Sequence, residues 1–258
     1  MRTRSIVVML LIAVVSGCAN EEQVTSPNLG MTGAALSREN LEAEVAALWL
    51  SGSLLAPDDP YDLLEFGFTS TREQFADSIP ELNSIRFVPP WIPGEIVIEL
   101  TPEAAAQMRE GEYTDLDSLN SLYGLTEIDT SLFFHRLWWV KLTFEENYHP
   151  ERLSEIYEPV PSVLAAGPNS TAWPYFNAYP WLIGGGTSYL FREGWEDCES
   201  GCVYNRFWYF WVIGTNVELV GTWDTSEEPV PPDWWTYGQT AMCYYDSGSL
   251  PVISGISE

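Results

Sequence analysis

Two segments in the middle of the chain place apolar residues at every second position, a pattern that is typical of strands with one buried face. They are the sequence EIVIEL after Pro93-Gly94 and residues 136–145, RLWWVKLTFE, and a further strand is expected at residues 125–134 between them. A shorter apolar run at residues 161–166 predicts a fourth strand. Each strand is expected to turn one set of side chains toward a core and the other set outward.

Helical periodicity fills the intervals between these strands. Thr101-Pro102 combines an N-cap with a proline at the first helical position, so it predicts a short helix. Residues 115–123 place leucines on one face before Gly124, and His149-Pro150 begins a further helix. The order β-α-β-β-α-β is that of a ferredoxin-like unit, here over residues 93–170. One sheet face of such a unit carries two helices and the other is left open.

Helices also dominate the N-terminal segment, residues 37–92. The first of them is expected to end at Gly52. A short second helix is expected to begin at Ser70, which forms a capping box with Glu73. Residues 56–62, APDDPYD, are predicted to be a turn-rich link between the two helices.

The C-terminal region, residues 171–226, predicts a small antiparallel β-meander. Its middle strand, expected at 203–213, carries aromatic residues on both faces. Such a strand must be covered on both sides or offer a surface. We therefore expect the meander to pack on the open face of the ferredoxin-like sheet or to extend that sheet. Residues 227–258 are predicted to be a proline-rich link and tail, with an edge strand around Cys243. The fold class is α+β.

The first residues of the chain resemble a bacterial lipoprotein signal over residues 1–17. Positive residues precede an apolar run that ends in Val15-Ser16-Gly17-Cys18. The resemblance implies that Cys18 carries diacylglycerol and an N-linked acyl chain and anchors the chain to a membrane. Ala19, in place of aspartate, favours the outer membrane, and residues 18–36 are predicted to be a flexible tether. The mature chain would then be extracytoplasmic, where disulfides are tolerated.

The charge of the chain limits its partners. The formal net charge is −26 at pH 7, and Lys141 is the only lysine. Nucleic acid and anionic lipid surfaces need basic patches, so both are excluded as partners. The negative charge is explained either by solubility or by attraction of cations or a basic partner.

The cysteines besides Cys18 are expected to be structural. Cys198 and Cys202 have C-x3-C spacing and acidic neighbours, which raise a thiol pKa and disfavour redox chemistry. A disulfide between them is the favoured interpretation, with a metal site and unpaired thiols as alternatives. Cys243 is either a buried free thiol, which is the favoured interpretation, or the disulfide partner of another cysteine.

The sequence contains no recognisable catalytic constellation. His135 and His149 are the only histidines, and neither is placed to serve as a base for a nucleophile. We interpret His135 as a turn residue and His149 as a helix start. The sequence therefore predicts no enzymatic activity, no metal and no cofactor.

Residues 93–169 resemble the propeptide domain of subtilisin-like proteases and the related inhibitor modules of bacterial lipoproteins. The resemblance rests on PGEIVIEL, a helix leading into YGLTEID, a strand ending in WWVKLTF, and HPERLSEIYE followed by PSVLAAGPN. Propeptides of this family bind the protease through the open sheet face and insert their C-terminal segment into the substrate cleft. The corresponding residues here are Ala166, Gly167, Pro168 and Asn169; the alanine, proline and asparagine match the family, and Gly167 replaces its usual acid.

These observations predict a lipid-anchored, non-enzymatic envelope protein. The resemblance implies an inhibitor or chaperone-like domain with a subtilisin-like protease as partner. A second possibility is a surface module that binds carbohydrate or peptidoglycan on an aromatic platform of Trp195, Trp208 and Trp223, unless these side chains fill a core. A third is a purely structural envelope protein.

Overall fold

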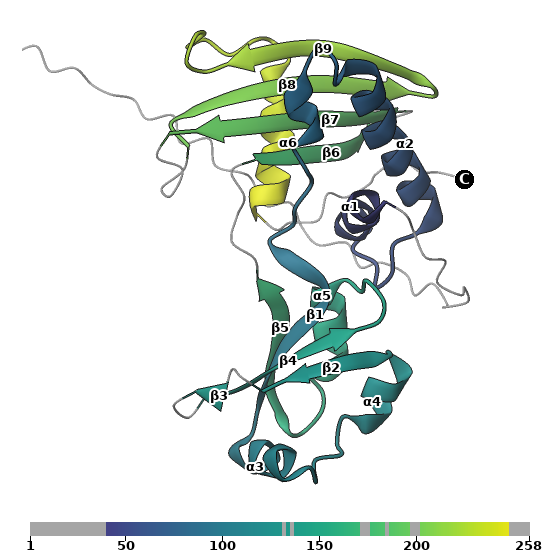
Figure 1. Cartoon of the computed structure of the whole chain (residues 1–258), viewed down its shortest axis with the longest axis vertical. Coiled ribbons are helices and arrows are strands. Elements are labelled where there is room, and N and C mark those ends of the chain that lie inside the picture. Colours follow the sequence, from purple (N-terminus) through teal and green to yellow (C-terminus); the bar gives the residue numbers. More distant parts are fainter. Residues whose placement is uncertain are drawn as a thin grey trace, which may run out of the picture. The chain divides into compact units, whose positions relative to one another are not determined.

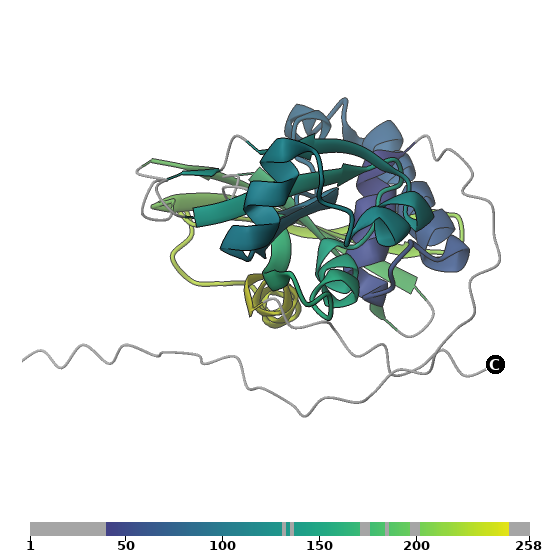
Figure 2. The same ribbon diagram turned by 90° about the horizontal axis from the view of Figure 1, so that it is seen from below.

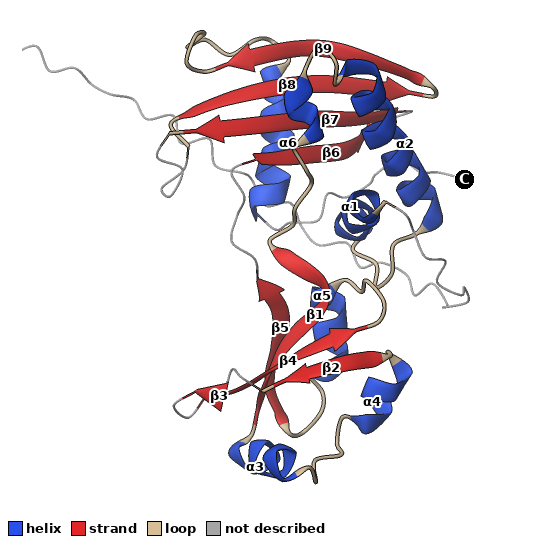
Figure 3. Cartoon of the chain, in the orientation of Figure 1, coloured by secondary structure: helices blue, strands red, loops and turns tan. Residues whose placement is uncertain are grey.

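The computed structural model describes residues 40–130, 133–134, 137–170, 176–183, 186–196 and 202–247, and all of them belong to one compact unit. The described chain is α+β, with six α-helices and two antiparallel sheets (Figure 1, Figure 3). Within these ranges, no helix has the length and apolar character needed to cross a membrane.

The first sheet lies in the middle of the sequence. Its strand order is β2-β4-β1-β5, and the short strand β3 pairs with β4 alone. The strands are β1 (Trp91–Leu100), β2 (Leu125–Asp129), β3 (Phe133–Phe134), β4 (Leu137–Phe144) and β5 (Val163–Ser170). The intervening helices are α3 (Pro102–Glu110), α4 (Asp117–Leu122) and α5 (Pro150–Tyr157). Strand β5 corresponds to the strand predicted at residues 161–166 and continues further, to Ser170.

One face of this sheet forms a hydrophobic core with the helices. Ile96, Ile98 and Leu142 are fully buried on it, together with Leu153 and Tyr157 of α5. These residues follow the period of two in the strands and the helical period in α5. The alternation in the sequence therefore identified the buried face correctly.

The second sheet is a meander in which each strand pairs with the next one along the chain, in the order β6-β7-β8-β9. Its strands are β6 (Phe176–Ile183), β7 (Gly186–Trp195), β8 (Tyr204–Ile213) and β9 (Asn216–Asp224). The first of these, β6, was not expected from the sequence. The prediction that the meander extends the ferredoxin-like sheet is wrong, because its strands form a separate sheet.

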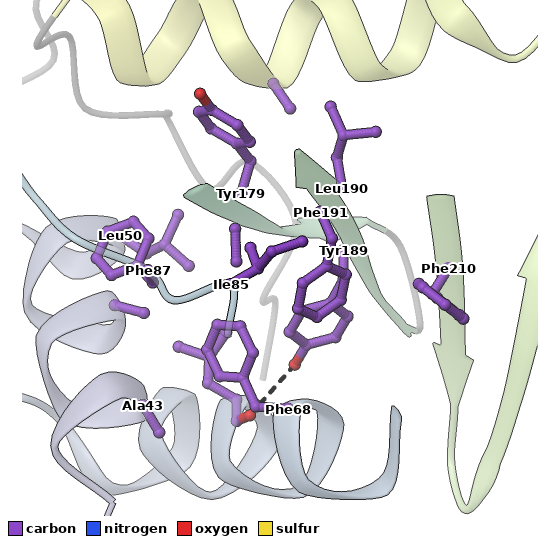
Figure 4. Close-up of a cluster of buried hydrophobic side chains, with 14 of the residues drawn as sticks. Ala43, Leu50, Phe68, Ile85, Phe87, Tyr179, Tyr189, Leu190, Phe191 and Phe210 are labelled. Atoms are coloured by element: carbon purple, nitrogen blue, oxygen red, sulfur yellow. Dashed lines mark hydrogen bonds between the residues drawn. The ribbon is translucent and has the colours of Figure 1, made fainter. Parts of the chain in front are cut away.

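Helices cover both faces of the meander. On one face, Phe68 of α2 packs edge-on against Tyr189, with ring centroids 5.0 Å apart (Figure 4). On the other face, Trp235 at the start of α6 lies 4.5 Å from Phe207. Figure 2 shows α2 and α6 on opposite sides of the sheet. The aromatic residues of β8 are therefore covered by these helices. The expectation that the first sheet would cover them is wrong.

The N-terminal helices differ in part from the prediction. Helix α1 (Leu41–Ser51) ends, as expected, at Gly52, whose φ of 59° is the left-handed conformation that glycine adopts readily. Helix α2 (Asp58–Phe75) is one continuous helix, so the expected link at 56–62 and the cap at Ser70 are wrong. Proline is tolerated in the first helical turn, which is where Pro60 lies.

Helix α6 (Trp235–Ser247) replaces the edge strand predicted around Cys243. Ala241 and Tyr245, one helical turn apart, are both buried, and the Tyr245 hydroxyl donates a hydrogen bond to the Pro180 carbonyl of β6. A stripe spaced by four residues fits a helix better than a strand. The second sheet supplies the apolar surface that this stripe covers.

A buried ion pair joins α1 to α2. Arg72 donates two hydrogen bonds to the Glu42 carboxylate, at 2.7 and 2.9 Å, and two more to the carbonyls of Leu82 and Ile85. The Glu42 carboxylate also accepts the backbone N–H of Phe87 at 2.7 Å. Two helices and the segment after the 3-10 helix Pro80–Asn83 therefore meet at one pair of side chains.

We expect Glu42→Gln to lower the free energy of unfolding by about 3 kcal/mol, because it leaves the mostly buried Arg72 guanidinium without a counter-charge. Urea denaturation at pH 7 measures this loss. The matched control is Glu155→Gln, which removes the exposed pair with Arg152 and should cost less than about 0.5 kcal/mol. Equal losses in the two variants would contradict the assigned role.

Candidate functional site

The face of the first sheet opposite the helices includes Gly167 and Asn169 of the expected protease-cleft segment. The strand register places eleven residues on this face: Glu95, Val97 and Glu99 of β1, Glu127 and Asp129 of β2, Trp139, Lys141 and Thr143 of β4, and Ala165, Gly167 and Asn169 of β5. None of them is fully buried, whereas their neighbours Ile96, Ile98 and Leu142 are. Helices α3 and α5 contact the sheet from the core side.

The charge on this face is predominantly negative. Four carboxylates share it with one ammonium group, that of Lys141. The Lys141 Nζ atom lies 3.9 Å from an oxygen of Glu95, and Asn169 donates a hydrogen bond of 2.6 Å to the other Glu95 oxygen. The Glu95 carboxylate is thus held in place from two sides. The other acids leave a field that attracts cationic groups.

The expected cleft segment forms part of strand β5. Ala166, Gly167 and Pro168 pair with Ile98, Val97 and Ile96 of β1, and Asn169 follows before the strand ends at Ser170. Because β5 is the last strand in the sheet order, its outer side pairs with no other described strand. The missing N–H of Pro168 is compatible with such an edge.

Gly167 leaves an open place at this edge. A Cβ atom built on it would meet no atom within 4 Å. Another chain can therefore approach the backbone closely there. The segment combines a fixed backbone, held by the pairing with β1, with an accessible outer side.

The aromatic platform expected from the sequence is not formed. Trp208 and Trp223 are only 4% and 9% exposed, because the helices that cover both faces of the meander bury them. Trp195 is half-buried beside Tyr204 and has the Arg206 guanidinium 5.7 Å from its ring. Trp208 and Trp223 are core residues and do not offer ring faces to a sugar.

Two of the four cysteines, Cys202 and Cys243, belong to the described residues. Cys18 and Cys198 lie outside the described residues, so lipidation of the first and the Cys198–Cys202 disulfide stay predictions. Cys202 and Cys243 are both disulfide-bonded, and no described cysteine is a free thiol. The expectation that Cys243 is a free thiol is therefore wrong. Because Cys18 was expected to be lipidated and Cys198 to pair with Cys202, no cysteine remained as a partner for Cys243.

His149 is a buried structural residue. Its ring lies tilted at 47° to that of Trp91, with ring centroids 4.9 Å apart, and its backbone N–H donates to the Leu54 carbonyl. Both ring nitrogens lack a hydrogen-bond partner. Burial, assisted by the nearby charge of Arg152, lowers the His149 pKa from 6.5 to about 4. His135 lies outside the described residues. Within the described part of the chain, no three His, Cys, Asp or Glu side chains are grouped to hold a metal ion.

Comparisons with known proteins found no matching family model, no matching curated protein and no matching solved structure. The geometry of the sheet therefore carries the functional argument. Sequence reasoning singled out Ala166–Asn169 but not the acids beside it. The same alternation that marked Ile96 and Ile98 as core residues placed Glu95 and Glu99 on the opposite face and could have identified them.

We expect His149→Phe to weaken the pH dependence of stability. A histidine whose pKa falls from 6.5 unfolded to about 4 folded binds more protons when unfolded, so it destabilises the fold as the pH falls through this window. Between pH 7 and pH 5 the wild type should lose about 2 kcal/mol more of unfolding free energy than the variant. Denaturant titrations at both pH values measure the difference. Identical losses would show that folding does not lower the His149 pKa.

Proposed function

We propose that this protein is a lipid-anchored, non-enzymatic protein of the cell envelope that binds a subtilisin-like protease. In this proposal Cys18 carries the anchor, most simply in the outer membrane, and residues 93–170 are a ferredoxin-like domain of the propeptide-inhibitor type. The strand order β2-β4-β1-β5, with all neighbours antiparallel, supports the fold part of the proposal. Helices α3 and α5 lie on one face of this sheet, as the split βαβ pattern requires.

The register between β1 and β5 is the observation that carries the proposal. It places Ala166–Asn169 at a sheet edge that borders the acidic face. A protease that binds peptides in extended conformation can pair with the outer side of such a strand through backbone hydrogen bonds. The acidic face would contact the protease surface beside its cleft.

The inhibitory step is occupation of the cleft, and no covalent chemistry is needed. The pairing of Gly167 with Val97 keeps the backbone extended before binding, which lowers the entropic cost of association. The hydrogen bond from Asn169 to Glu95 fixes the end of the segment. If the bond after Asn169 were cut, the segment would stay attached through the sheet and could continue to block the cleft.

Inhibition tests this function directly. The chain from Glu21 onward, which contains all described residues, is titrated against subtilisin-like proteases while activity and chain cleavage are followed. We expect stoichiometric inhibition that Gly167→Val weakens at least about tenfold, because the new side chain blocks the close approach of the protease.

The control variant is Thr222→Val on the exposed side of β9, which should inhibit like the wild type. Gly167→Val should not unfold the domain, since a Cβ at this position meets no neighbour and valine is favoured in strands. Absence of inhibition by the folded wild-type chain would refute the proposal. Inhibition that is unchanged in Gly167→Val would refute the role of the segment.

A further inference from the structure

A groove of about 1160 Å³ lies between α1, α2 and the extended segment Arg86–Pro93. Its lining includes the apolar side chains of Leu41, Val45, Phe66 and Phe87. Leu41 is 54% exposed and Phe66 37% exposed, so part of this apolar surface faces solvent. No residue of β5 lines the groove, which is therefore distinct from the strand edge proposed to bind a protease.

The wall that α2 contributes is acidic. Asp62, Glu65 and Glu73 line the groove along three turns of the helix. Among the described residues, none of these three carboxylates is paired with an arginine or lysine. Glu65 accepts a hydrogen bond of 2.9 Å from the Tyr61 hydroxyl.

The positive charges at the groove are already engaged. Arg72 is bound to Glu42, and Arg86 donates to the Ile85 carbonyl and lies 3.9 Å from Glu42. Burial and the neighbouring charge of Arg72 lower the pKa of Arg86. The carboxylates of the α2 wall are therefore available to an external cation. They lie beside apolar side chains that are exposed to solvent, a combination typical of interaction sites.

We propose that this groove binds a cationic segment of a partner protein that carries apolar side chains between its lysines or arginines. The apolar side chains would occupy the space beside Phe66 and Leu41, and the basic groups would lie along Asp62, Glu65 and Glu73. This arrangement follows the general pattern of an amphipathic segment in a groove. Charge complementarity selects the occupant.

Charge also argues against other occupants. A second copy of this chain has a net charge of −26, and anionic lipid carries the same sign, so both are repelled by the acidic wall. A neutral apolar ligand would leave the three carboxylates without a counter-charge. A basic, partly apolar peptide is the chemistry that satisfies both parts of the lining.

The probe is a fluorescein-labelled 14-residue peptide of leucine and lysine, arranged so that leucine occupies one helical face. Two further peptides test its parts: in one, serine replaces leucine; in the other, glutamate replaces lysine. Binding to the chain from Glu21 onward is measured by fluorescence anisotropy at two salt concentrations. We expect the leucine–lysine peptide to bind more tightly than either of the others and to weaken with salt.

The decisive variant is Asp62→Asn with Glu65→Gln and Glu73→Gln. It should weaken binding about tenfold, since three exposed charge contacts are removed. The matched control neutralises three exposed acids elsewhere, Glu110, Glu112 and Asp117, and should weaken binding less than about twofold. Circular dichroism and thermal unfolding verify that both triple variants are folded.

The variant Phe66→Ser distinguishes binding in the groove from non-specific electrostatic attraction of a basic peptide to an acidic protein. It should weaken binding of the leucine–lysine peptide several-fold and leave the serine–lysine peptide unaffected. Equal losses in the two triple variants, or equal binding of the leucine and serine peptides, would overturn the proposal. A dimer that is seen in sedimentation and that dissociates in the Asp62, Glu65 and Glu73 triple variant would also overturn the proposal. The occupant of the groove would then be a second copy of the chain.

Discussion

The ion pair between Glu42 and Arg72 is the contact on which the N-terminal part of the fold depends. The guanidinium of Arg72 donates to a carboxylate on α1 and to two carbonyls of the segment that follows α2. Its flat face also lies over the rings of Phe68 and Phe191. One side chain thus sets the position of α1, of α2 and of the chain that leads into β1. Both the cover of the meander and the walls of the groove follow from that arrangement.

The two surfaces proposed for binding share a sign of charge but differ in construction. The sheet edge presents backbone groups whose conformation the pairing with β1 holds, so its recognition depends little on side-chain identity. The groove presents side chains of α2 beside exposed apolar surface, so its recognition depends on the pattern of basic and apolar residues in the partner. At both surfaces the nearby basic groups already have acidic partners, since Lys141 lies beside Glu95 at the sheet and the groove arginines lie beside Glu42.

Local patterns predicted the first sheet well and the second region poorly. Ile96, Ile98, Val140 and Leu142 are buried as their alternation indicated, and Gly52 ends α1 as expected. The core of the second region joins residues that are distant in the sequence, so the partners of β8 were not visible in its own pattern. Pro60 and the capping signal at Ser70 suggested a break in α2 that packing against β7 overrides. The acidic face was not predicted, although the alternation around Ile96 and Ile98 contains the information for it. The groove depends on three separate segments and could not be predicted.

The larger hydrophobic cluster is built from two stretches, one from Ala43 to Trp91 and one from Ala178 to Tyr245, while the first sheet lies between them in the sequence. A chain made from its N-terminus onward therefore produces α1 and α2 long before the strands that cover them. The first sheet has all its strands within one continuous stretch and can close earlier. Until β7 and β8 emerge, Leu64 and Phe68 remain open to water, to proteases and to holding chaperones. The N-terminal helices are thus the part of a nascent chain that most needs protection, and a chain that stops at Ser170 would leave them without their core.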